Sequence, residues 1–381
     1  ANYDIRNSLF LYNTNSAVQM DRVTDASVEN NTFYGNAPAA ISLMSSVNSV
    51  LRNNIFGLTA AEAYAYGGTS NDVANNVTMD YNVYYFSEPG YIYSTFNTLL
   101  PWQLNYGHDY RSAITNPLFA AVDNRDFHLQ SAAGRYLPGT GFVTTDSETS
   151  WAIDKGDPWA DYSLEPDENG ARINIGRYGG TEEASKGSTN VVVYARSLND
   201  PVFITDTNSI WPLIWTAINV PTDTLVTVQY SGDGGVTWED IATGLNVYEE
   251  YIIWQPTFED NSYSALWRVV DSTNAPVYVD TNDTEAGLFF GTFEISEANN
   301  MEGTNMHYII WRGAWNEAYQ VEYSYGFTQF GDIIWSNCVD GVGSNQAAYR
   351  FTTSGGNFRY EDIESPNRSN RLYRVKWIQS P

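Results

Sequence analysis

The sequence predicts an all-β protein in which a stack of short-stranded coils precedes two β-sandwich modules. Three observations support this fold class: a repeat of 23 to 28 residues near the start, short alternating strands after residue 189, and an aromatic content of 15%. A fixed period of this size is typical of stacked copies of one structural unit. Aromatic residues are enriched in strands, so the 28 tyrosines and 12 tryptophans favour β packing.

The repeat consists of four related segments, each with an aliphatic residue, a polar residue and an aromatic residue in register. They span residues 5–10, 28–33, 51–56 and 79–84, at steps of 23, 23 and 28 residues. A helical solenoid would require apolar residues three and four apart over ten or more positions, and none of the copies has that pattern. Short strands wound into coils therefore fit the repeat better than helices.

Like residues of successive copies are expected to lie in lines, because alternate strand residues point to opposite faces. The last position predicts an inner aromatic column of Phe10, Phe33, Phe56 and Tyr84, and the first predicts an aliphatic line of Ile5, Val28, Leu51 and Met79. A polar line is predicted from Ser8, Asn31, Asn54 and Asn82. Asparagine tolerates left-handed backbone geometry and its amide can bond to copies above and below, so we expect it at the bend between strands.

These segments resemble the coils of the right-handed parallel β-helix of pectate-lyase-like proteins. Four later strings, at residues 116–119, 126–130, 152–158 and 170–181, resemble the closing segment of β-helix domains in large secreted bacterial proteins, especially of the planctomycete and verrucomicrobial groups. The resemblance covers about half of the chain. It implies a fold and an extracellular location rather than a particular activity.

Composition limits the partners of the protein. The net charge is −26, from 45 acidic against 19 basic residues, so nucleic acid and anionic membranes would be repelled. Calcium, cationic partners or a salty exterior fit better. No run of 18 apolar residues occurs, so no membrane span is predicted. Cys338 is the only cysteine, which excludes an intrachain disulfide and predicts a small buried apolar side chain.

The chain divides at a polar stretch, residues 182–189, where the repeat has ended. We predict a coil domain with its closing segment at 1–188 and two immunoglobulin-like or fibronectin-like β-sandwiches at 189–290 and 291–381, because short alternating strands separated by turns are typical of sandwiches. Ala1 falls inside the first coil. Open coil ends expose apolar side chains and strand edges, so this end is expected to meet further coils of a precursor or another protein surface.

One motif in the first sandwich matches a known hairpin. Residues 231–238 fit the Asp-box pattern, which resembles turns in sialidase propellers. Asp233 is expected to bond backbone amides of the turn and Trp238 to pack beneath it. A propeller would need several copies and the chain has one, so the motif indicates a structural turn.

An acidic loop offers a candidate cation site. Asp154, Asp157 and Asp161, followed by Glu165 and Asp167, place hard oxygen ligands close together in sequence, which is the chemistry that calcium prefers. The spacing is not that of an EF-hand. The alternative is that these carboxylates are solvated or cap turns.

Catalytic groups are harder to find. His128 lies in a strand-like string and is expected to be a packing residue. Equivalent positions of the coils carry Arg6, Glu29, Arg52 and Asp80. Their alternating sign predicts an outward-facing ladder of salt bridges rather than a catalytic row, since glycoside hydrolases need carboxylates converging on one site.

The predicted function is therefore a non-catalytic extracellular protein of a surface layer, stalk or fibre, which binds itself or other cell-surface proteins. The open coil end predicts head-to-tail assembly, because a contact that does not close on itself builds filaments. Two alternatives remain: a polysaccharide lyase or glycoside hydrolase fragment of β-helix type, and a carbohydrate-binding protein that uses exposed Trp and Tyr. No cofactor is predicted apart from the calcium ion of the acidic loop.

Overall fold

The computed structural model describes residues 3–74, 77–199, 203–204, 210–257, 260, 262–273 and 276–288, and beyond them seven strands. Both parallel and antiparallel sheets are present, and helices are few and short, which confirms the all-β class. Cys338 and the predicted boundary at residues 290 and 291 lie outside the described residues.

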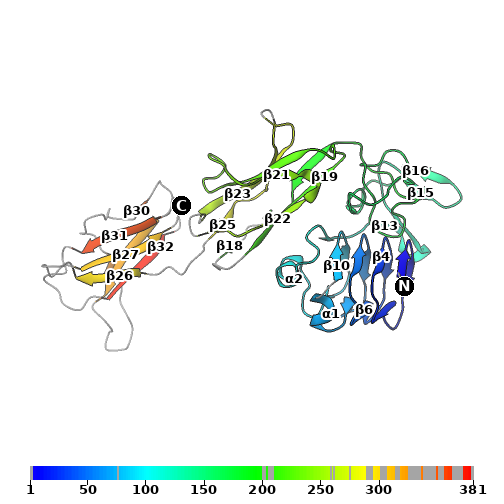
Figure 1. Cartoon of the computed structure of the whole chain (residues 1–381), viewed down its shortest axis with the longest axis horizontal. Helices are drawn as coiled ribbons and strands as arrows, with labels where there is room; N and C mark the ends of the chain where they lie inside the picture. Colours follow the sequence, from blue (N-terminus) through cyan, green and yellow to red (C-terminus); the bar gives the residue numbers. More distant parts are fainter. Residues whose placement is uncertain are drawn as a thin grey trace.

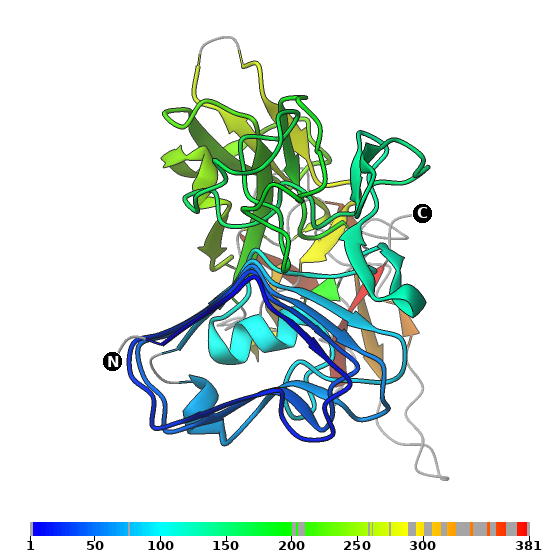
Figure 2. The ribbon, with the colours of Figure 1, turned by 90° about the vertical axis from the view of Figure 1, so that its right-hand side faces the viewer.

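The first part of the chain winds into a coil with three parallel sheets. The first sheet contains β1 (Tyr3–Arg6), β4 (Ala26–Glu29), β7 (Ser49–Arg52) and β10 (Val77–Asp80). The second contains β2 (Leu9–Leu11), β5 (Thr32–Tyr34), β8 (Ile55–Leu58), β11 (Val83–Phe86) and β12 (Ala113–Ile114). The third contains β3 (Val18–Asp21), β6 (Ala39–Met44) and β9 (Tyr64–Gly67). Figure 2 looks along the coil and shows its turns superposed around a roughly triangular outline.

The strand pairing has the offset of the sequence repeat. Ile5 pairs with Val28 in the first sheet, and Phe10 pairs with Phe33 in the second. The rings of Phe10 and Phe33 stack with centroids 4.8 Å apart, and Phe33 and Phe56 stack at 5.2 Å. Tyr84 continues this column at 5.4 Å from Phe56. Like residues are therefore piled along the interior, where burial of apolar surface stabilises the coil.

The bend between the first and second strands of each turn contains a left-handed residue, followed by the residue of the polar line. Asn7, Asn30, Asn53 and Tyr81 adopt left-handed backbone angles, with φ between 48° and 56°. These residues come one position before the predicted polar line. The expectation that Asn31, Asn54 and Asn82 take the left-handed geometry is therefore wrong by one residue, because their preceding neighbours make the turn.

The asparagines of the polar line instead form a hydrogen-bonded ladder. The backbone N–H of Asn31 donates to Oδ1 of Asn54 at 3.0 Å, and that of Asn54 donates to Oδ1 of Asn82 at 3.0 Å. Nδ2 of Asn54 also donates to the carbonyl of Val28 at 2.8 Å. All three asparagines are fully buried, so each ties its own turn to both neighbours where water cannot satisfy the backbone.

A short helix closes the end of the coil opposite β1. Helix α2 (Leu99–Tyr106) lies across the coil in Figure 2, and a smaller helix, α1 (Ser70–Ala74), sits in the wall. Trp102 of α2 is completely buried and stacks on Tyr66 with centroids 6.4 Å apart. The indole Nε1 donates to Asp109 Oδ2 at 2.9 Å, and Tyr84 donates to the same oxygen at 2.8 Å. The aromatic column and the asparagine ladder therefore both end at Trp102 and Asp109, which we call the plug.

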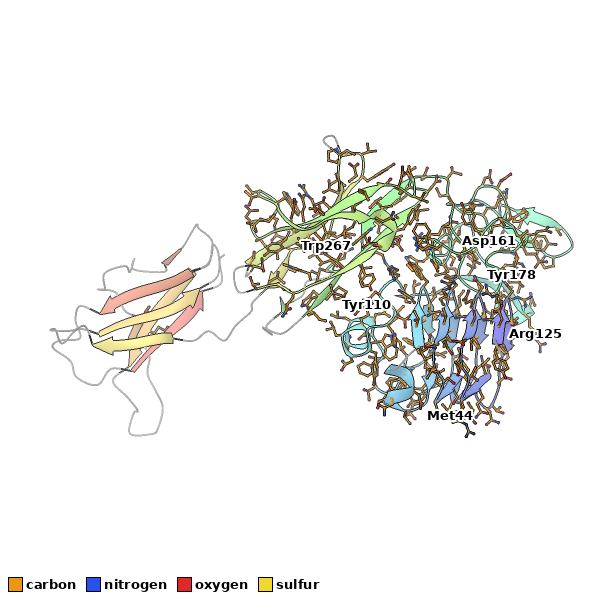
Figure 3. The ribbon with its side chains drawn as sticks, viewed as in Figure 1. Met44, Tyr110, Arg125, Asp161, Tyr178 and Trp267 are labelled. Carbon is orange, nitrogen blue, oxygen red and sulfur yellow. The ribbon has the colours of Figure 1, made fainter. Side chains whose placement is uncertain are left out.

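The chain then returns along the outside of the coil. Short hairpins come first: β13 (Phe119–Ala121) with β14 (Asp126–Leu129), joined by η1 (Val122–Asn124), and β15 (Arg135–Leu137) with β16 (Gly141–Val143). Residues 150–181, which we call the strap, have no regular strands and run across the bends of successive turns. Figure 3 shows Asp161 and Tyr178 of this region above the coil.

Two sheets follow and share one apolar core. One contains β17 (Val192–Ala195), β19 (Trp211–Ile218) and β22 (Tyr251–Trp254). The other contains β18 (Phe203–Ile204), β25 (Ala286–Leu288), β23 (Ser262–Asp271), β20 (Leu225–Ser231) and β21 (Glu239–Asn246), with β24 (Val279–Thr281) on β23 and η2 (Val247–Glu249) after β21. Within the described residues the strand pairs of both sheets are antiparallel, except for β18 with β25, which is parallel. Trp215 and Trp267 are fully buried between the sheets. We call residues 192–288 the two-sheet unit (Figure 1).

The last described strands form two further sheets. One contains β26 (Ile295–Asn300), β27 (His307–Gly313) and β31 (Gly356–Asp362). The other contains β28 (Ala318–Ser324), β29 (Ser336–Asn337), β30 (Tyr349–Arg350) and β32 (Leu372–Ile378). These strands agree with the short strands expected after residue 189. The division into three domains at 188 and 290 stays a prediction.

Candidate functional site

The most elaborate polar arrangement lies where the coil, the strap and the two-sheet unit meet. Arg172 of the strap donates from Nη1 to Glu250 Oε1 at 2.6 Å and from Nη2 to Glu250 Oε2 at 2.8 Å. The two side chains are 2% and 1% exposed, so the pair is shut off from water. A bidentate guanidinium–carboxylate pair fixes the orientation as well as the distance of its partners.

Backbone groups complete the surroundings of this pair. Arg172 also donates to the carbonyls of Gly156 at 2.5 Å and Ala217 at 2.8 Å. The N–H of Ala217 donates to Glu250 Oε1 at 2.9 Å. Glu250 adopts a left-handed backbone angle of 57° directly after η2, which turns its carboxylate back toward the strap. Both charges are thus paired and hydrogen-bonded, which buried charges require.

A second set of contacts, made by Arg111, connects the last turn of the coil to the segment around Glu250. Arg111 donates from Nη1 to Asp80 Oδ2 at 2.6 Å and from Nη2 to the carbonyl of Glu249 at 2.8 Å. Its guanidinium lies 4.5 Å from the ring centre of Tyr251, and Tyr110 stacks on that ring at 4.4 Å. Figure 3 shows Tyr110 between the coil and the two-sheet unit. Arg111 therefore bridges β10 and the start of β22.

A third cation contributes from the two-sheet unit. Arg196, which follows β17, donates from Nη2 to the carbonyl of Ser112 at 2.8 Å and from Nη1 to that of Arg111 at 3.2 Å. We call Asp80, Arg111, Arg172, Arg196 and Glu250 the junction cluster. Three arginines and two carboxylates hold together segments far apart in sequence.

Burial changes the titration of groups around the junction cluster. Desolvation raises the pKa of Asp80, although Arg111 opposes the shift. The pKa of Lys155 is lowered to about 8, mainly by burial and then by the charge of Arg172. Burial and the neighbouring guanidinium groups both disfavour the charged form of Lys155, so it loses its proton at a lower pH than an exposed lysine.

The strap contacts the bend of successive turns. Nδ2 of Asn7 donates to the carbonyl of Gly179 at 2.8 Å, and Nδ2 of Asn30 donates to that of Asn174 at 2.9 Å. In the third turn, Asn53 Oδ1 accepts from the backbone N–H of Asp157 at 2.8 Å. The left-handed asparagines thus make the bend with their backbone and bind the strap with their side chains.

Close packing explains two glycines of the strap. A Cβ on Gly179 would lie 1.9 Å from the carbonyl oxygen of Asn174 and 2.4 Å from Nδ2 of Asn30. Gly176 has a φ of 98°, and a Cβ there would lie 2.6 Å from Ile55. Side chains at these positions would push the strap off the coil.

The charged column of the coil forms only part of the predicted ladder. Glu29 lies 3.3 Å from Arg6 and 3.4 Å from Arg52. Arg52 also pairs with Asp157 of the strap, and Asp80 pairs with Arg111. The expected surface column is wrong in exposure at two positions, because Glu29 and Asp80 are only 4% and 9% exposed and lie against their arginine partners.

The structure places the three predicted calcium ligands in separate surroundings. Asp157 pairs with Arg52, while Asp161 accepts from the N–H of Ser163 at 2.9 Å within its own turn. Asp154 is buried, and its backbone N–H donates to Asn174 Oδ1 at 2.8 Å. Within the described residues, no group of three or more His, Cys, Asp or Glu could hold a metal ion. Two of these carboxylates therefore act as turn or ion-pair partners.

Glu165 is a buried acid of the strap that sequence reasoning did not separate from the acidic loop. Its Oε1 accepts from the N–H groups of Asn174 at 2.8 Å and Gly180 at 2.7 Å, and it is 7% exposed. Burial raises its pKa to about 8, and the nearby charge of Asp154 adds to the shift. At neutral pH the protonated form is favoured, so Glu165 joins two parts of the strap without a full charge.

His128 packs inside the closing region. Its Nδ1 lies 2.6 Å from Asp126 Oδ1, and its ring stacks on Tyr178 with centroids 3.6 Å apart. The side chain is 1% exposed. A substrate could not reach this imidazole without displacing Tyr178 or its neighbours.

The Asp-box residues form a tight hairpin turn. Asp233 accepts from the backbone N–H of Thr237 at 2.8 Å and from its hydroxyl at 2.6 Å. The indole of Trp238 donates to the carbonyl of Gly235 at 3.0 Å and lies 4.0 Å from the guanidinium of Arg268. Apart from the contact with Arg268 of β23, these interactions lie within the turn.

No known protein-family model matches this chain, and a comparison with curated proteins finds no similar sequence. In the part of the chain that the structure describes, no helix is long and apolar enough to cross a membrane. The geometry itself therefore has to carry the functional argument.

Sequence reasoning missed the junction cluster. Arg172 was noticed only as part of the string at 170–181, and Arg111, Arg196 and Glu250 were not singled out. One signal was present: Glu250 is an acid between the apolar runs 247–248 and 251–254. A charged residue in such a setting is seldom buried unless it is paired.

Proposed function

We propose that this protein is a non-catalytic structural or adhesive component of an extracellular surface layer, stalk or fibre. In this proposal the first region is the end of a right-handed parallel β-helix of the pectate-lyase-like kind, and the following regions are immunoglobulin-like modules. The fold argument rests on the three parallel sheets with stacked aromatic residues and on the two sheets around Trp215 and Trp267.

The observation that carries the function is the buried Arg172–Glu250 pair. Flexible linkers between domains are the ordinary case, because most interdomain interfaces are small and polar. Here a bidentate pair, the Arg111 bridge and the stacked Tyr110 and Tyr251 fix the coil to the two-sheet unit. A fixed joint suits a protein that transmits force or sets a distance between partners.

The enzyme alternative receives less support from the charged column. Glu29 and Asp80 are buried and paired with arginines, so they do not face an accessible cleft. A polymer substrate needs carboxylates that converge on a reachable glycosidic bond.

Head-to-tail assembly is part of the same proposal. β1, β2 and β3 are the terminal strands of their sheets among the described residues, and Tyr3 and Tyr12 beside them are 57% and 54% exposed. Unpaired strand edges are templates for another strand. A neighbouring copy could supply it.

Two measurements test the proposed function. Small-angle scattering should give a single extended shape for the wild type and a broader range of dimensions for Glu250→Gln. Electron microscopy at high concentration should show end-to-end oligomers, and isolated monomers alone would exclude the head-to-tail part. Release of unsaturated products from acidic polysaccharides would replace the structural proposal by the enzyme alternative.

A further inference from the structure

One tryptophan of the strap differs from the other described tryptophans. Trp159 is 66% exposed, whereas Trp102, Trp215 and Trp267 are almost completely buried. Its ring meets Tyr248 edge to face, with centroids 6.2 Å apart and planes at 70°. Most of the indole surface therefore remains in solvent.

The loop that carries Trp159 is held in place at several points. The N–H of Trp159 donates to Asp157 Oδ1 at 2.9 Å, and the N–H of Ala160 donates to the Asp157 carbonyl at 3.0 Å. Asp157 is itself bound to Arg52 and Asn53 of the coil. The backbone that carries the ring is thus held before any ligand arrives, so the loop would lose little freedom on binding.

The chemistry around the ring is acidic. Asp161 is exposed, and hydrogen bonds from Ser163 lower its pKa, so it is ionised at neutral pH. The exposed Leu164 extends the apolar surface of the same loop. The net charge of −26 adds a long-range attraction for cations. An exposed indole with an exposed carboxylate two residues further along the same loop suits a ligand that has an apolar face and a positive charge, because tryptophan is the best side chain for cation–π contact.

We propose that Trp159 and Asp161 form a binding platform for a polysaccharide of cationic amino sugars. The indole stacks on the C–H face of one sugar ring, and the Asp161 carboxylate pairs with a sugar ammonium group. Neither residue belongs to the junction cluster, so the platform can be tested without altering the Arg172–Glu250 pair.

Titration calorimetry with a glucosamine hexamer, at mildly acidic pH and low salt, tests the platform. The wild type should bind, and Trp159→Ala should raise Kd by about tenfold or more. Asp161→Asn, which keeps the acceptor for Ser163, should weaken binding and reduce its salt dependence. Phe142→Ala removes an exposed ring from a hairpin outside the strap and serves as the matched control, with unchanged Kd.

Three results would overturn the proposal. The first is the absence of binding by the wild type, and the second is equal affinity of the wild type and Trp159→Ala. The third is equal binding of the neutral N-acetylglucosamine hexamer, which would remove the role of charge. If Trp159→Ala instead abolished self-association in sedimentation without any sugar binding by the wild type, the ring would belong to a protein contact. Circular dichroism should be unchanged in all variants, since the truncated side chains are exposed.

Discussion

Arg172 and Glu250, 78 residues apart, form a two-bonded ion pair that water does not reach. Glu250 also accepts from the backbone of β19, and Arg172 also donates to the strap. The pair is therefore a meeting point of three segments rather than an isolated bridge. Removal of the pair should loosen the contact between the coil and the two-sheet unit as well as lower the stability of each.

Glu250→Gln tests this pair directly. The variant keeps the shape of the side chain but leaves the Arg172 guanidinium buried without a counter-ion, so we expect a loss of about 3–5 kcal/mol in the free energy of unfolding. Chemical denaturation followed by tryptophan fluorescence measures it. Glu168→Gln is the control, because the Glu168 side chain is 57% exposed and its pair with Lys186 should contribute at most about 1 kcal/mol. Equal effects of the two substitutions would contradict the assigned role.

Asn54→Ala should weaken the coil through its backbone. The substitution leaves the N–H of Asn31 and the carbonyl of Val28 buried without their partners, at a cost of about 1–3 kcal/mol for each group. Hydrogen exchange should accelerate at the bends of the neighbouring turns. Asn105→Ala removes only an exposed bond to Pro101 and should leave the coil unaffected. Unchanged exchange in Asn54→Ala would mean that the ladder does not stabilise the stack.

Gly179→Ala should detach the strap from the first two turns. The added methyl group would overlap the Asn174 carbonyl and the Asn30 amide, so the strap must move. We expect cleavage within residues 150–181 by a low concentration of protease at temperatures where the wild type is resistant. Gly232→Ala is a suitable comparison, since its Cβ would come no closer than 3.3 Å to the nearest atom. Resistance of Gly179→Ala equal to that of the wild type would refute the close packing.

The raised pKa of Glu165 predicts a pH dependence of stability. The folded protein holds this proton up to about pH 8, whereas the unfolded chain releases it near 4.5. Between these values the folded state binds more protons, so the free energy of unfolding falls as pH rises, by up to about 5 kcal/mol for this group. Glu165→Gln should remove that slope.

Lys155 provides the control for this prediction. Its pKa is lowered to about 8 from 10.5, so its contribution changes above pH 8, where stability should increase with pH. Lys155→Met should therefore leave the slope between pH 4.5 and 8 unchanged. A wild-type slope equal to that of Glu165→Gln would show that Glu165 is already ionised in the folded state.

Chelation tests the predicted calcium site. Because Asp157 is paired with Arg52 and Asp161 caps its own turn, we expect the melting temperature to stay the same after treatment with EDTA. Differential scanning calorimetry with and without added calcium measures this. A clear stabilisation by calcium that is lost in Asp154→Asn would support the ion in the acidic loop.

The sequence predicted the parts of the fold that depend on repetition. Phe10, Phe33 and Phe56 recur at a fixed step, and a fixed step in a coil places identical side chains above one another. The predicted position of the left-handed residue was one residue too late, because Asn30–Asn31 and Asn53–Asn54 are pairs of identical residues. The residue type alone does not tell which asparagine of a pair adopts the left-handed conformation and which forms the hydrogen-bonded ladder.

Contacts between distant segments were not predictable in the same way. Strand alternation predicted that Glu29 and Asp80 would be exposed, but Glu29 lies between Arg6 and Arg52, and Arg111 pairs with Asp80. The pairing of Arg172 with Glu250 depends on how the strap and the two-sheet unit meet. Nothing periodic in the sequence encodes that contact, so only the three-dimensional structure reveals it.

The asparagine ladder has a consequence for the length of the coil. Asn31 and Asn54 offer the same donor and acceptor to their neighbours, and the rings beside them are nearly parallel. An additional 23-residue copy could be inserted between them without altering the plug formed by Trp102 and Asp109. Gene duplication within the repeat would therefore lengthen the coil in uniform increments and leave its closing helix unchanged.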